Sequence, residues 1–481
     1  MGEKGFLKHF AIIGGGTFLN LLLGVFTTPL ITRIVDPDEY GQHSFFLLYA
    51  NLALLILLLG MDQGLGRFYF LKAEREYRRA LLFRCVQYPF FVTLAVAAIV
   101  IVVSVTGLVH LEFPPIIMSL LCGYTFFEVL FRFGLNVNRL EYNSKMYSAL
   151  NIALKAIYVG LALPLLLIFK GNDLLMLCIA STGSVFVVLV ISILSQKEMW
   201  NIRANNDAAC SVDRVDLIKY AFPLTITMGI TYLFQALDRL SIKHFCTYAD
   251  VGVYASTISL VNIFMIIQTT FNTLWSPMAI EHFSNDPEDK TFYQKGNQTI
   301  TVIMFFLGVS LILCKDVFAL LLGEKYREAA YILPFLIFHP MMYTISETTV
   351  IGINFMKKSN MTILIAGVSC LANFVGNTIL VPRIGPKGAA ISTGLSYILF
   401  FALRTLISNH YFYVDFKLKK FTILTIVVCA YAFYNTFVKF NWLSIVGYVV
   451  CVLVIVFLYK DVVVWGMNYL FGLVNQFFHK S

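Results

Sequence analysis

The sequence predicts an all-α polytopic membrane protein with about fourteen transmembrane helices, and its composition and loop lengths carry that prediction. Apolar residues make up 59% of the 481 positions, whereas charged residues make up only 13%, about half the share usual in soluble proteins. Because one span takes about 20 apolar residues, this content suffices for about fourteen spans. The same numbers exclude a soluble multidomain protein, a disordered chain, a secreted disulfide scaffold and a nucleic-acid-binding domain.

The apolar runs fall into three groups along the chain. Six spans are expected at 9–32, 43–66, 85–109, 116–137, 146–169 and 174–195. After a polar stretch from Gln196 to Lys219, six more are expected at 220–244, 254–280, 299–322, 331–355, 360–381 and 388–410. Two further spans follow at 421–438 and 441–459. The loops are too short to hold a soluble catalytic domain.

The net charge of +9 is interpreted as a signal of orientation. With the N-terminus inside, the cytoplasmic segments contain 22 of the 36 Lys and Arg residues, and the opposite segments contain eight. Cytoplasmic loops of membrane proteins carry such an excess of basic residues. Both termini are therefore expected in the cytoplasm. The remaining six basic residues fall inside the spans.

The layout of the spans predicts an internal repeat. A shift of 211 residues aligns Lys8 with Lys219, Gly41 with Gly252 and Asn51 with Asn262. The expected organisation is an N-terminal six-helix lobe (1–195), a cytoplasmic linker (196–219), a C-terminal six-helix lobe (220–410), two additional helices (421–459) and an interfacial tail (460–481). Parallel repeats of this kind bind substrate between the halves. The alternative is two unrelated halves of equal length.

Eleven charged residues lie inside the expected spans, where a charge costs at least about 2.5–3.5 kcal/mol at the bilayer centre. Each is interpreted as lining a cavity or pathway, or as one half of an ion pair. The cations are Arg67, Arg132, Lys155, Arg239, Lys315 and Arg404, and the carboxylates are Asp62, Glu128, Asp238, Asp316 and Glu347.

Spacing assigns some partners to these charges. Glu128 and Arg132 are four residues apart on one helix and share a face. Glu128 and Lys155 lie equally far from the turn near residue 141, so a pair between them is expected, either as structural glue or as part of a cavity lining. A Glu128→Gln variant is expected to fail to fold in the first case and to lose only transport in the second.

Charged residues that are adjacent in the sequence are not expected to pair with each other. The side chains of Lys315 and Asp316 are expected to diverge by about 100° around a helix, as are those of Asp238 and Arg239, so each would need a partner from another helix. Arg67 and Arg404 lie at span ends, where they either face the cleft or reach the headgroups.

Amides within the spans are candidates for sugar contacts or for bonds between helices. They are Asn20, Asn51, Gln235, Asn262, Gln268 and Asn272. No metal-ligand spacing, nucleophile constellation or phosphate loop is present in the sequence, and the nine cysteines are scattered without a C-x-x-C pair. No enzyme activity, metal or cofactor is therefore expected.

Three motifs resemble a known family. Thr27–Gly41 (TTPLITRIVDPDEYG), Gly60–Tyr69 (GMDQGLGRFY) and Gly385–Thr393 (GPKGAAIST) are similar to the polysaccharide transporters, the Wzx-like branch of the multidrug/oligosaccharidyl-lipid/polysaccharide exporter superfamily. The resemblance implies a monomeric flippase of the bacterial plasma membrane. Its substrate would be a polyprenyl-diphosphate-linked oligosaccharide for O-antigen, capsule or exopolysaccharide synthesis, and a polysaccharide polymerase would be its partner.

In that setting the embedded residues take expected roles. The diphosphate would bind in a cationic cleft formed by Arg67, Arg132, Lys155 and Arg239. Asp62, Glu128, Asp238 and Glu347 would couple transport to an ion or pair with the cations, and the amides would contact sugars. A lipid II flippase, a drug–cation antiporter and, as the enzyme alternative, a polysaccharide polymerase or ligase remain open.

Overall fold

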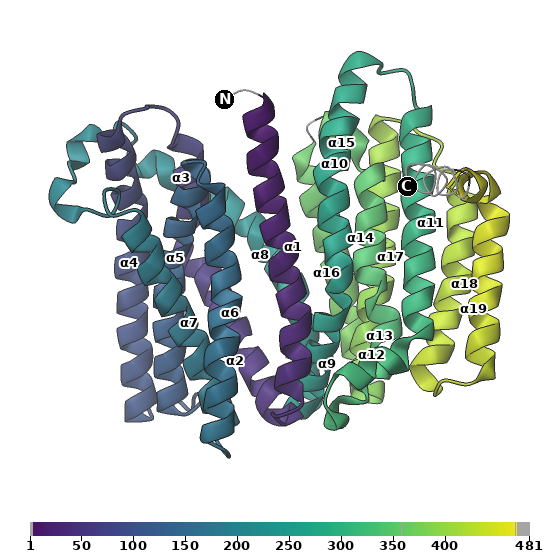
Figure 1. The fold of residues 1–481 in the computed structure, drawn as a ribbon, viewed down its shortest axis with the longest axis horizontal. Helices are drawn as coiled ribbons and strands as arrows, with labels where there is room; N and C mark the ends of the chain where they lie inside the picture. Colours follow the sequence, from purple (N-terminus) through teal and green to yellow (C-terminus); the bar gives the residue numbers. More distant parts are fainter. Residues whose placement is uncertain (1–2, 357, 467, 469–481) are drawn as a thin grey trace, which may run out of the picture. The chain divides into compact units, whose positions relative to one another are not determined.

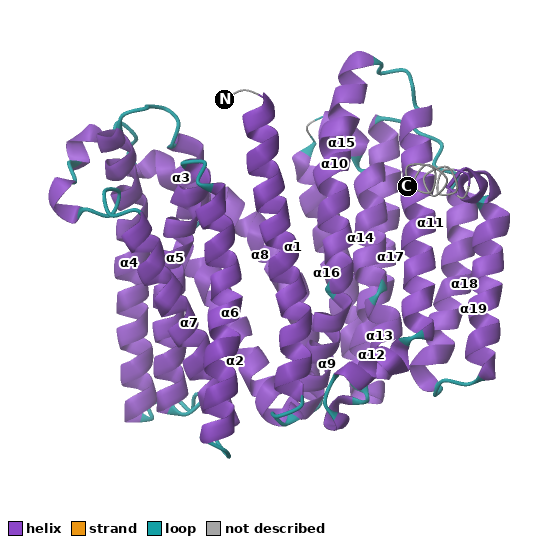
Figure 2. Cartoon of the chain, in the orientation of Figure 1, coloured by secondary structure: helices purple, strands orange, loops and turns teal. Residues whose placement is uncertain are grey.

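The computed structural model describes residues 3–356, 358–466 and 468, and these residues form helices and connecting loops without any strand (Figure 2). The chain packs as two compact units, Met1–Ala236 and Leu237–Ser481, and the boundary between them lies within one long helix, α8 (Arg214–Phe245). Each unit is described by itself. The part of the expected tail at 469–481 lies outside the described residues.

In the described part of unit 1, seven helices precede α8, and Figure 1 labels each of them. They are α1 (Glu3–Thr32), α2 (Pro37–Leu58), α3 (Met61–Phe68), α4 (Arg75–Thr106), α5 (Pro115–Leu140), α6 (Ser144–Ile168) and α7 (Asp173–Ser195). Two 3-10 turns, η1 (Ile202–Ala204) and η2 (Asp207–Ala209), connect α7 to α8.

In the described part of the chain, unit 2 continues from α8 through the labelled helices α9 to α19. They are α9 (Tyr248–Val261), α10 (Ile263–Asn285), α11 (Thr291–Leu313), α12 (Lys315–Leu321), α13 (Ala329–Leu336), α14 (Phe338–Thr349), α15 (Ile351–Phe355), α16 (Ser359–Ile384), α17 (Pro386–Tyr411), α18 (Leu418–Phe437) and α19 (Trp442–Leu458). The short turn η3 (Glu324–Tyr326) joins α12 to α13.

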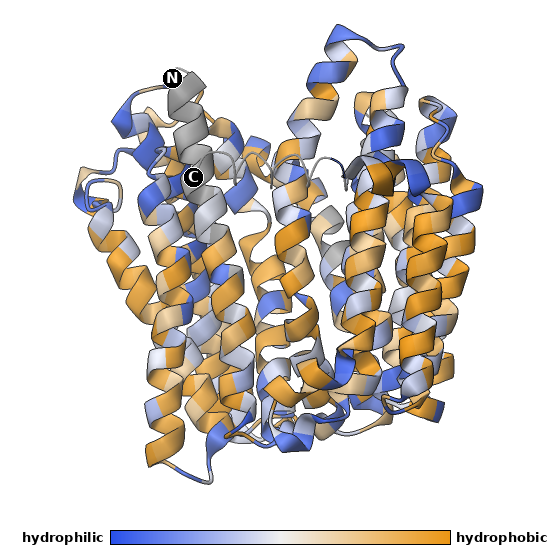
Figure 3. Cartoon of the chain, turned by 45° about the vertical axis from the view of Figure 1, so that its right-hand side comes forward, coloured by the Kyte–Doolittle hydropathy of each residue, from blue (hydrophilic) through white to orange (hydrophobic). Residues whose placement is uncertain are grey.

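The polytopic all-α class is confirmed. Among the described residues, 11 helices are long and apolar enough to cross a membrane, or 13 if each of two bent pairs counts as one span. The expected segment at 220–244 is helical as part of α8, which is not among these candidates. Figure 3 shows apolar residues along the helices and hydrophilic residues gathered toward their ends. The chain is a multi-pass membrane protein.

Several segments expected as single helices are broken in the structure. The segment 43–66 divides between α2 and α3, and 254–280 bends by 41° between α9 and α10. The segments 299–322 and 331–355 divide at Cys314, Ile337 and Val350. Hydropathy did not reveal these breaks because the apolar character continues across each of them.

The break between α2 and α3 has a steric cause at Gly60. Leu59 and Gly60 both adopt left-handed backbone angles, with φ of 48° and 67°. A Cβ atom on Gly60 would lie 2.6 Å from the carbonyl oxygen of Ala221 in α8 and 2.8 Å from Oγ1 of Thr225. The first glycine of the Gly60–Tyr69 motif therefore permits both the turn and the close approach of α8.

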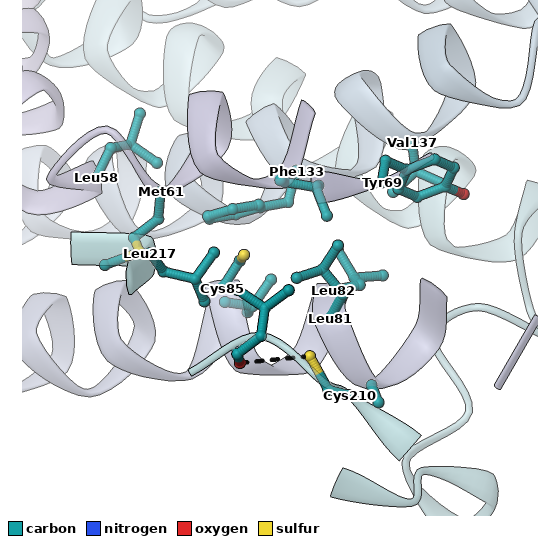
Figure 4. Close-up of a cluster of buried hydrophobic side chains, with 14 of the residues drawn as sticks. Leu58, Met61, Tyr69, Leu81, Leu82, Cys85, Phe133, Val137, Cys210 and Leu217 are labelled. Atoms are coloured by element: carbon teal, nitrogen blue, oxygen red, sulfur yellow. Dashed lines mark hydrogen bonds between the residues drawn. The ribbon is translucent and has the colours of Figure 1, made fainter. Parts of the chain in front are cut away.

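Buried apolar side chains from α2, α3, α4, α5 and α8 and from the α7–α8 connection form one cluster in unit 1 (Figure 4). Leu58, Met61, Leu82 and Phe133 bring α2, α3, α4 and α5 into one cluster. Cys210 joins this cluster from the connection, and its thiol lies 3.8 Å from the carbonyl oxygen of Val212. The expected linker at 196–219 is therefore packed against unit 1.

Arg84 of α4 fixes the connection by polar contacts. Its guanidinium forms an ion pair with Asp207 (2.9 Å) and donates hydrogen bonds to the carbonyl oxygens of Asp207 (2.8 Å), Val212 (2.7 Å) and Cys210 (3.3 Å). The hydrogen bond from Arg84 holds the pKa of Asp207 below its usual range. Arg75 forms a second ion pair with this connection, through Glu198, but the side chains of Arg75 and Glu198 are both exposed.

We expect Arg84→Gln to release the connection, because it removes several charge-assisted hydrogen bonds worth about 1.5–3 kcal/mol each. In limited trypsin digestion of the purified protein, cleavage at Arg203 should become at least about tenfold faster. Arg75→Gln is the matched control, since an exposed ion pair contributes about 0–1 kcal/mol. Equal digestion rates for the two variants would contradict this account of the linker.

Candidate functional site

Three of the charges that the sequence places inside spans of unit 1, Glu128, Arg132 and Lys155, lie on α5 and α6. Glu128 and Arg132 form the expected pair within α5, with 3.1 Å between Oε1 and Nε. The carboxylate is buried, whereas the arginine side chain is 39% exposed. Asp62 on α3 and Tyr232 on α8 lie within electrostatic range of Arg132. The guanidinium therefore keeps part of its surface accessible, with α3 and α8 nearby and its partner on its own helix, α5.

Lys155 on α6 differs from the expectation. The predicted Glu128–Lys155 pair is absent, because Glu128 is engaged by Arg132 on its own helix while Lys155 lies toward α1. A Cβ atom on Gly24 of α1 would lie 3.9 Å from Nζ of Lys155. Within the described part of the chain, the half-buried Lys155 has neither an ion-pair nor a hydrogen-bond partner. No described residue compensates this cation, which lies among apolar neighbours in the middle of α6.

Asp62 and Arg67 lie on the short helix α3 and not on one continuous transmembrane helix. Asp62 is half-buried and accepts a hydrogen bond from Nε2 of Gln63 (2.9 Å). Arg67 is exposed in the last turn of α3. The following motif residue, Tyr69, is buried and donates a hydrogen bond to Glu141 (2.5 Å). The Gly60–Tyr69 motif thus fixes the junction of α3, α4 and α5.

The most completely bonded charge in unit 2 is Asp238, on α8. This buried carboxylate accepts hydrogen bonds from the hydroxyls of Tyr254 (2.6 Å) and Thr393 (2.6 Å) through Oδ2. Through Oδ1 it accepts hydrogen bonds from the amides of Asn377 (2.9 Å) and Asn373 (3.1 Å). All four donors are uncharged and come from α9, α16 and α17. We call this group of five residues the Asp238 cage.

Sequence reasoning found Asp238 but missed the other members of its cage. Asn373 and Asn377 are four residues apart on α16, and both are completely buried. Asn377 also donates to Oδ1 of Asn373 (3.1 Å), so the two amides form one polar strip. Two amides at this spacing inside an apolar helix were a usable signal, because polar residues in spans turn toward a partner.

Arg404 and Glu347 form a second buried pair in unit 2. Nη1 of Arg404 on α17 lies 2.7 Å from Glu347 and 2.6 Å from the hydroxyl of Ser346, both on α14. The guanidinium also lies over the rings of Tyr343 and Phe400, 5.4 Å and 5.5 Å from their centroids. Arg404 is therefore held between helices and does not extend to the headgroups.

The two pairs of charged residues that are adjacent in the sequence differ in where their partners come from. Asp238 obtains its partners from other helices, as expected, and the neighbouring Arg239 is half-buried. The expectation was wrong for Lys315 and Asp316, which form an ion pair of 3.0 Å. The reason is the helix break at Cys314: Lys315 begins α12, where no preceding turn of the same helix fixes the direction of its long side chain.

The six amides proposed for sugar contacts differ in their bonding. Asn51 donates to the carbonyl oxygen of Leu47 in its own helix (2.7 Å), Gln235 is exposed, and Asn262 lies at the α9–α10 break. Three others carry buried side-chain oxygens that have no hydrogen-bond donor among the described residues: Asn20, Gln268 and Asn272. Gln268 and Asn272 are four residues apart on α10 and share a face.

The cavities described within each unit are not lined by any residue of the expected cationic cleft. One, of about 500 Å³, lies in unit 1 beside Arg75, Asn138, Glu141, Gln196 and Glu198. The other, of about 390 Å³, lies in unit 2 beside Asp316, Arg327, Tyr331 and Lys439.

We expect Asp238→Ala to destabilise unit 2 strongly, because it leaves four buried donors without their acceptor at about 1–3 kcal/mol each. Asp238→Asn should cost less, since its oxygen still accepts from the asparagine amides and the two hydroxyls can rotate to accept from its amide. Thermal unfolding of the purified variants measures the difference. Equal losses, or no loss in the alanine variant, would contradict the bonding described for the cage.

Comparison with known proteins places the chain in a family. Residues 6–283 match the family model described as polysaccharide biosynthesis protein. The chain is 23% identical over 185 residues to a Haloferax volcanii protein named "Probable low-salt glycan biosynthesis flippase Agl15". That match covers 37% of this chain and 38% of the flippase, so it spans well under half of either protein.

Two solved structures share the fold. A structure of the lipid II flippase MurJ in an inward closed conformation has a TM-score of 0.69 and 14% identity, covering 94% of this chain and all of that one. An inward-facing multidrug resistance MATE family transporter has a TM-score of 0.55 and 12% identity, covering 82% and 94%. These similar proteins are flippases and transporters rather than enzymes. The chain therefore belongs to the polysaccharide biosynthesis protein family.

Proposed function

We propose that this protein is a flippase that moves a polyprenyl-diphosphate-linked oligosaccharide across the membrane by alternating access, for the synthesis of a surface polysaccharide such as O-antigen, capsule or exopolysaccharide. The observation that carries the proposal is Lys155. It is a half-buried cation within an apolar helix, and no described residue compensates its charge. An anionic substrate group would supply the missing partner.

The cost of such a cation indicates a function. A lysine near the middle of a span costs at least about 2.5–3.5 kcal/mol, so an unpaired one is expected to serve a ligand or pathway. An ammonium group only donates hydrogen bonds, which suits it to phosphate oxygens. Arg132 adds a guanidinium whose side chain is 39% exposed despite its bond to Glu128. Lys155 and Arg132, with Arg67 and Arg239 as further candidates, would attract a diphosphate.

The structure separates the candidate carboxylates into two kinds. Glu128 and Glu347 are bound to arginines and act as ion-pair partners. Asp238 is bound only through uncharged donors, so its charge can be cancelled by a proton or a small cation without breaking an ion pair. We therefore assign ion coupling to Asp238 and, as a weaker alternative, to the half-buried Asp62.

Hydrogen-bond capacity supports the sugar contacts. The buried side-chain oxygens of Asn20, Gln268 and Asn272 lack donors among the described residues, and sugar hydroxyls are donors. The other three amides, Asn51, Gln235 and Asn262, stay weaker candidates because the first is bonded within its helix and the second is exposed.

The loops and the membrane potential support outward transport. The excess of basic residues in alternate loops supports cytoplasmic termini in a plasma membrane. Outward movement of an anion from a negative interior is favoured by about 2.3 kcal/mol per charge for each 100 mV. The name of the Agl15 relative, a glycan biosynthesis flippase, agrees with a glycolipid substrate. A lipid II flippase is the alternative, since the MurJ fold covers most of the chain.

We expect Lys155→Met to fold normally and to lose transport by about ten- to hundredfold, because one charge-assisted hydrogen bond to phosphate contributes about 1.5–3 kcal/mol. The assay is recovery of surface polysaccharide in a bacterial strain that lacks its own polysaccharide flippase. Lys145→Met is the matched control, since Lys145 is an exposed lysine in the first turn of the same helix and should behave as wild type.

Parallel complementation tests distinguish the substrates. Rescue of a strain depleted of its lipid II flippase, without rescue of surface polysaccharide, would replace the proposed substrate by the peptidoglycan precursor. Drug efflux alone would reject both glycolipid substrates. Full activity of Lys155→Met would remove the lysine from the substrate path even if the protein rescues polysaccharide synthesis.

We expect Asp238→Asn to reach the membrane in normal amounts but to transport poorly, because the variant keeps the shape of the cage and removes the charge that a coupling ion would neutralise. Membrane abundance and polysaccharide recovery are measured in the same cells. Wild-type transport by this variant would limit Asp238 to a structural role.

A further inference from the structure

We propose that the cavity of about 390 Å³ in unit 2 binds the phosphate ester headgroup of an anionic membrane lipid. We call it the Tyr331 pocket; its lining includes Asp316, Leu320, Arg327, Tyr331, Lys439 and Phe440. None of these residues belongs to the proposed transport path, so the inference goes beyond the proposed function. It rests on an excess of positive charge beside an apolar rim.

The pocket is assembled by a break in one span and a turn between two others. The chain leaves α11 at Cys314, runs through the seven-residue helix α12, and enters α13, which carries Tyr331. The turn between α18 and α19 adds Lys439 and Phe440. Figure 1 shows α12, α13 and this turn at the same end of unit 2. Such an end is where headgroups of a bilayer would lie.

The carboxylate of the pocket is already neutralised. Asp316 lies 3.0 Å from Nζ of Lys315, whose side chain is completely buried. Lys315 also lies over the Tyr331 ring, 4.7 Å from its centroid, and Lys387 lies 4.5 Å from the same centroid. Two ammonium groups therefore share one aromatic ring, an arrangement that an anion nearby would favour.

Two further cations line the pocket, and neither has a carboxylate partner among the residues that the structure describes. Arg327 donates one hydrogen bond from Nη1 to the carbonyl oxygen of Ala319 (3.1 Å), which fixes the guanidinium and uses only one of its five N–H donors. Lys439 is exposed and has no ion-pair partner among the described residues. Including Glu328, which lies beside Tyr331, four cations meet two carboxylates here.

The exposed apolar residues at the rim of the pocket favour a ligand with both a charged headgroup and apolar chains over a free anion. Val317, Leu320 and Phe440 are 61%, 57% and 50% exposed, although all three are large and apolar. Phosphate oxygens would contact Arg327 and Lys439, since arginine matches phosphate geometry and lysine acts as a point charge. The acyl chains would lie along the apolar rim. Basic pockets between membrane helices recognise lipid headgroups in this way.

The test measures lipid binding by the purified full-length protein, using native mass spectrometry with added phosphatidylglycerol or phosphatidylcholine. Wild type should bind the anionic lipid at least tenfold more tightly than the zwitterionic one. Lys439→Gln and Arg327→Gln should each reduce that preference several-fold, and the double variant should abolish it. Lys170→Gln is the matched control, because Lys170 is an exposed lysine in a short loop of unit 1.

Further arms identify the source of the phosphate. Inorganic phosphate and pyrophosphate, added alone, should compete with the lipid only weakly, because neither occupies the apolar rim. Competition as strong as that of the lipid itself would overturn the lipid assignment in favour of a free anion. Equal binding of the two lipids by wild type, or wild-type preference in the Lys439→Gln variant, would overturn the proposal. Transport is not measured, so loss of the proposed function would leave this result unchanged.

Discussion

The free-energy cost of a charge in a bilayer is the constraint on which the rest of this structure depends. A chain that is 13% charged and spans the membrane many times must exclude charge from its helices or compensate it there. Glu128 is compensated by an arginine one turn away on its own helix, and Glu347 by an arginine on another helix. Asp238 is compensated by four neutral donors. Against this background Lys155 stands out, because no described residue pairs with it.

An ion pair and a cage of neutral donors differ in whether the charge of the buried group can change. An ion pair such as Arg404–Glu347 locks two helices together, because removing either partner would leave a buried charge without compensation. A cage of hydroxyl and amide donors tolerates a change in the charge at its centre, since hydroxyls can rotate. Unit 2 contains both arrangements. The ion pair joins α14 and α17, and the cage joins α8, α9, α16 and α17. One is suited to rigidity and the other to switching.

The helix breaks raise the same cost for the polar groups of the backbone. The turn at Leu59–Gly60 lets α8 approach the end of α2, and the break at Cys314 lets Lys315 reach back to its neighbour Asp316. In a hydrocarbon environment an interrupted helix exposes backbone groups, so breaks are tolerated where protein covers them. Both breaks place charged or polar residues next to another element of the same unit.

The sequence by itself determined the membrane class, the positions of the helical segments and the family, because hydrophobicity and short motifs are local properties. It also determined the Glu128–Arg132 pair, whose geometry is fixed by spacing on one helix. Only the tertiary structure decided that Lys155 lies toward α1 rather than toward Glu128, and that Asn373, Asn377 and Thr393 surround Asp238. The physical reason is that contacts between helices depend on their rotation about their axes, which apolar runs of nearly uniform hydropathy leave open.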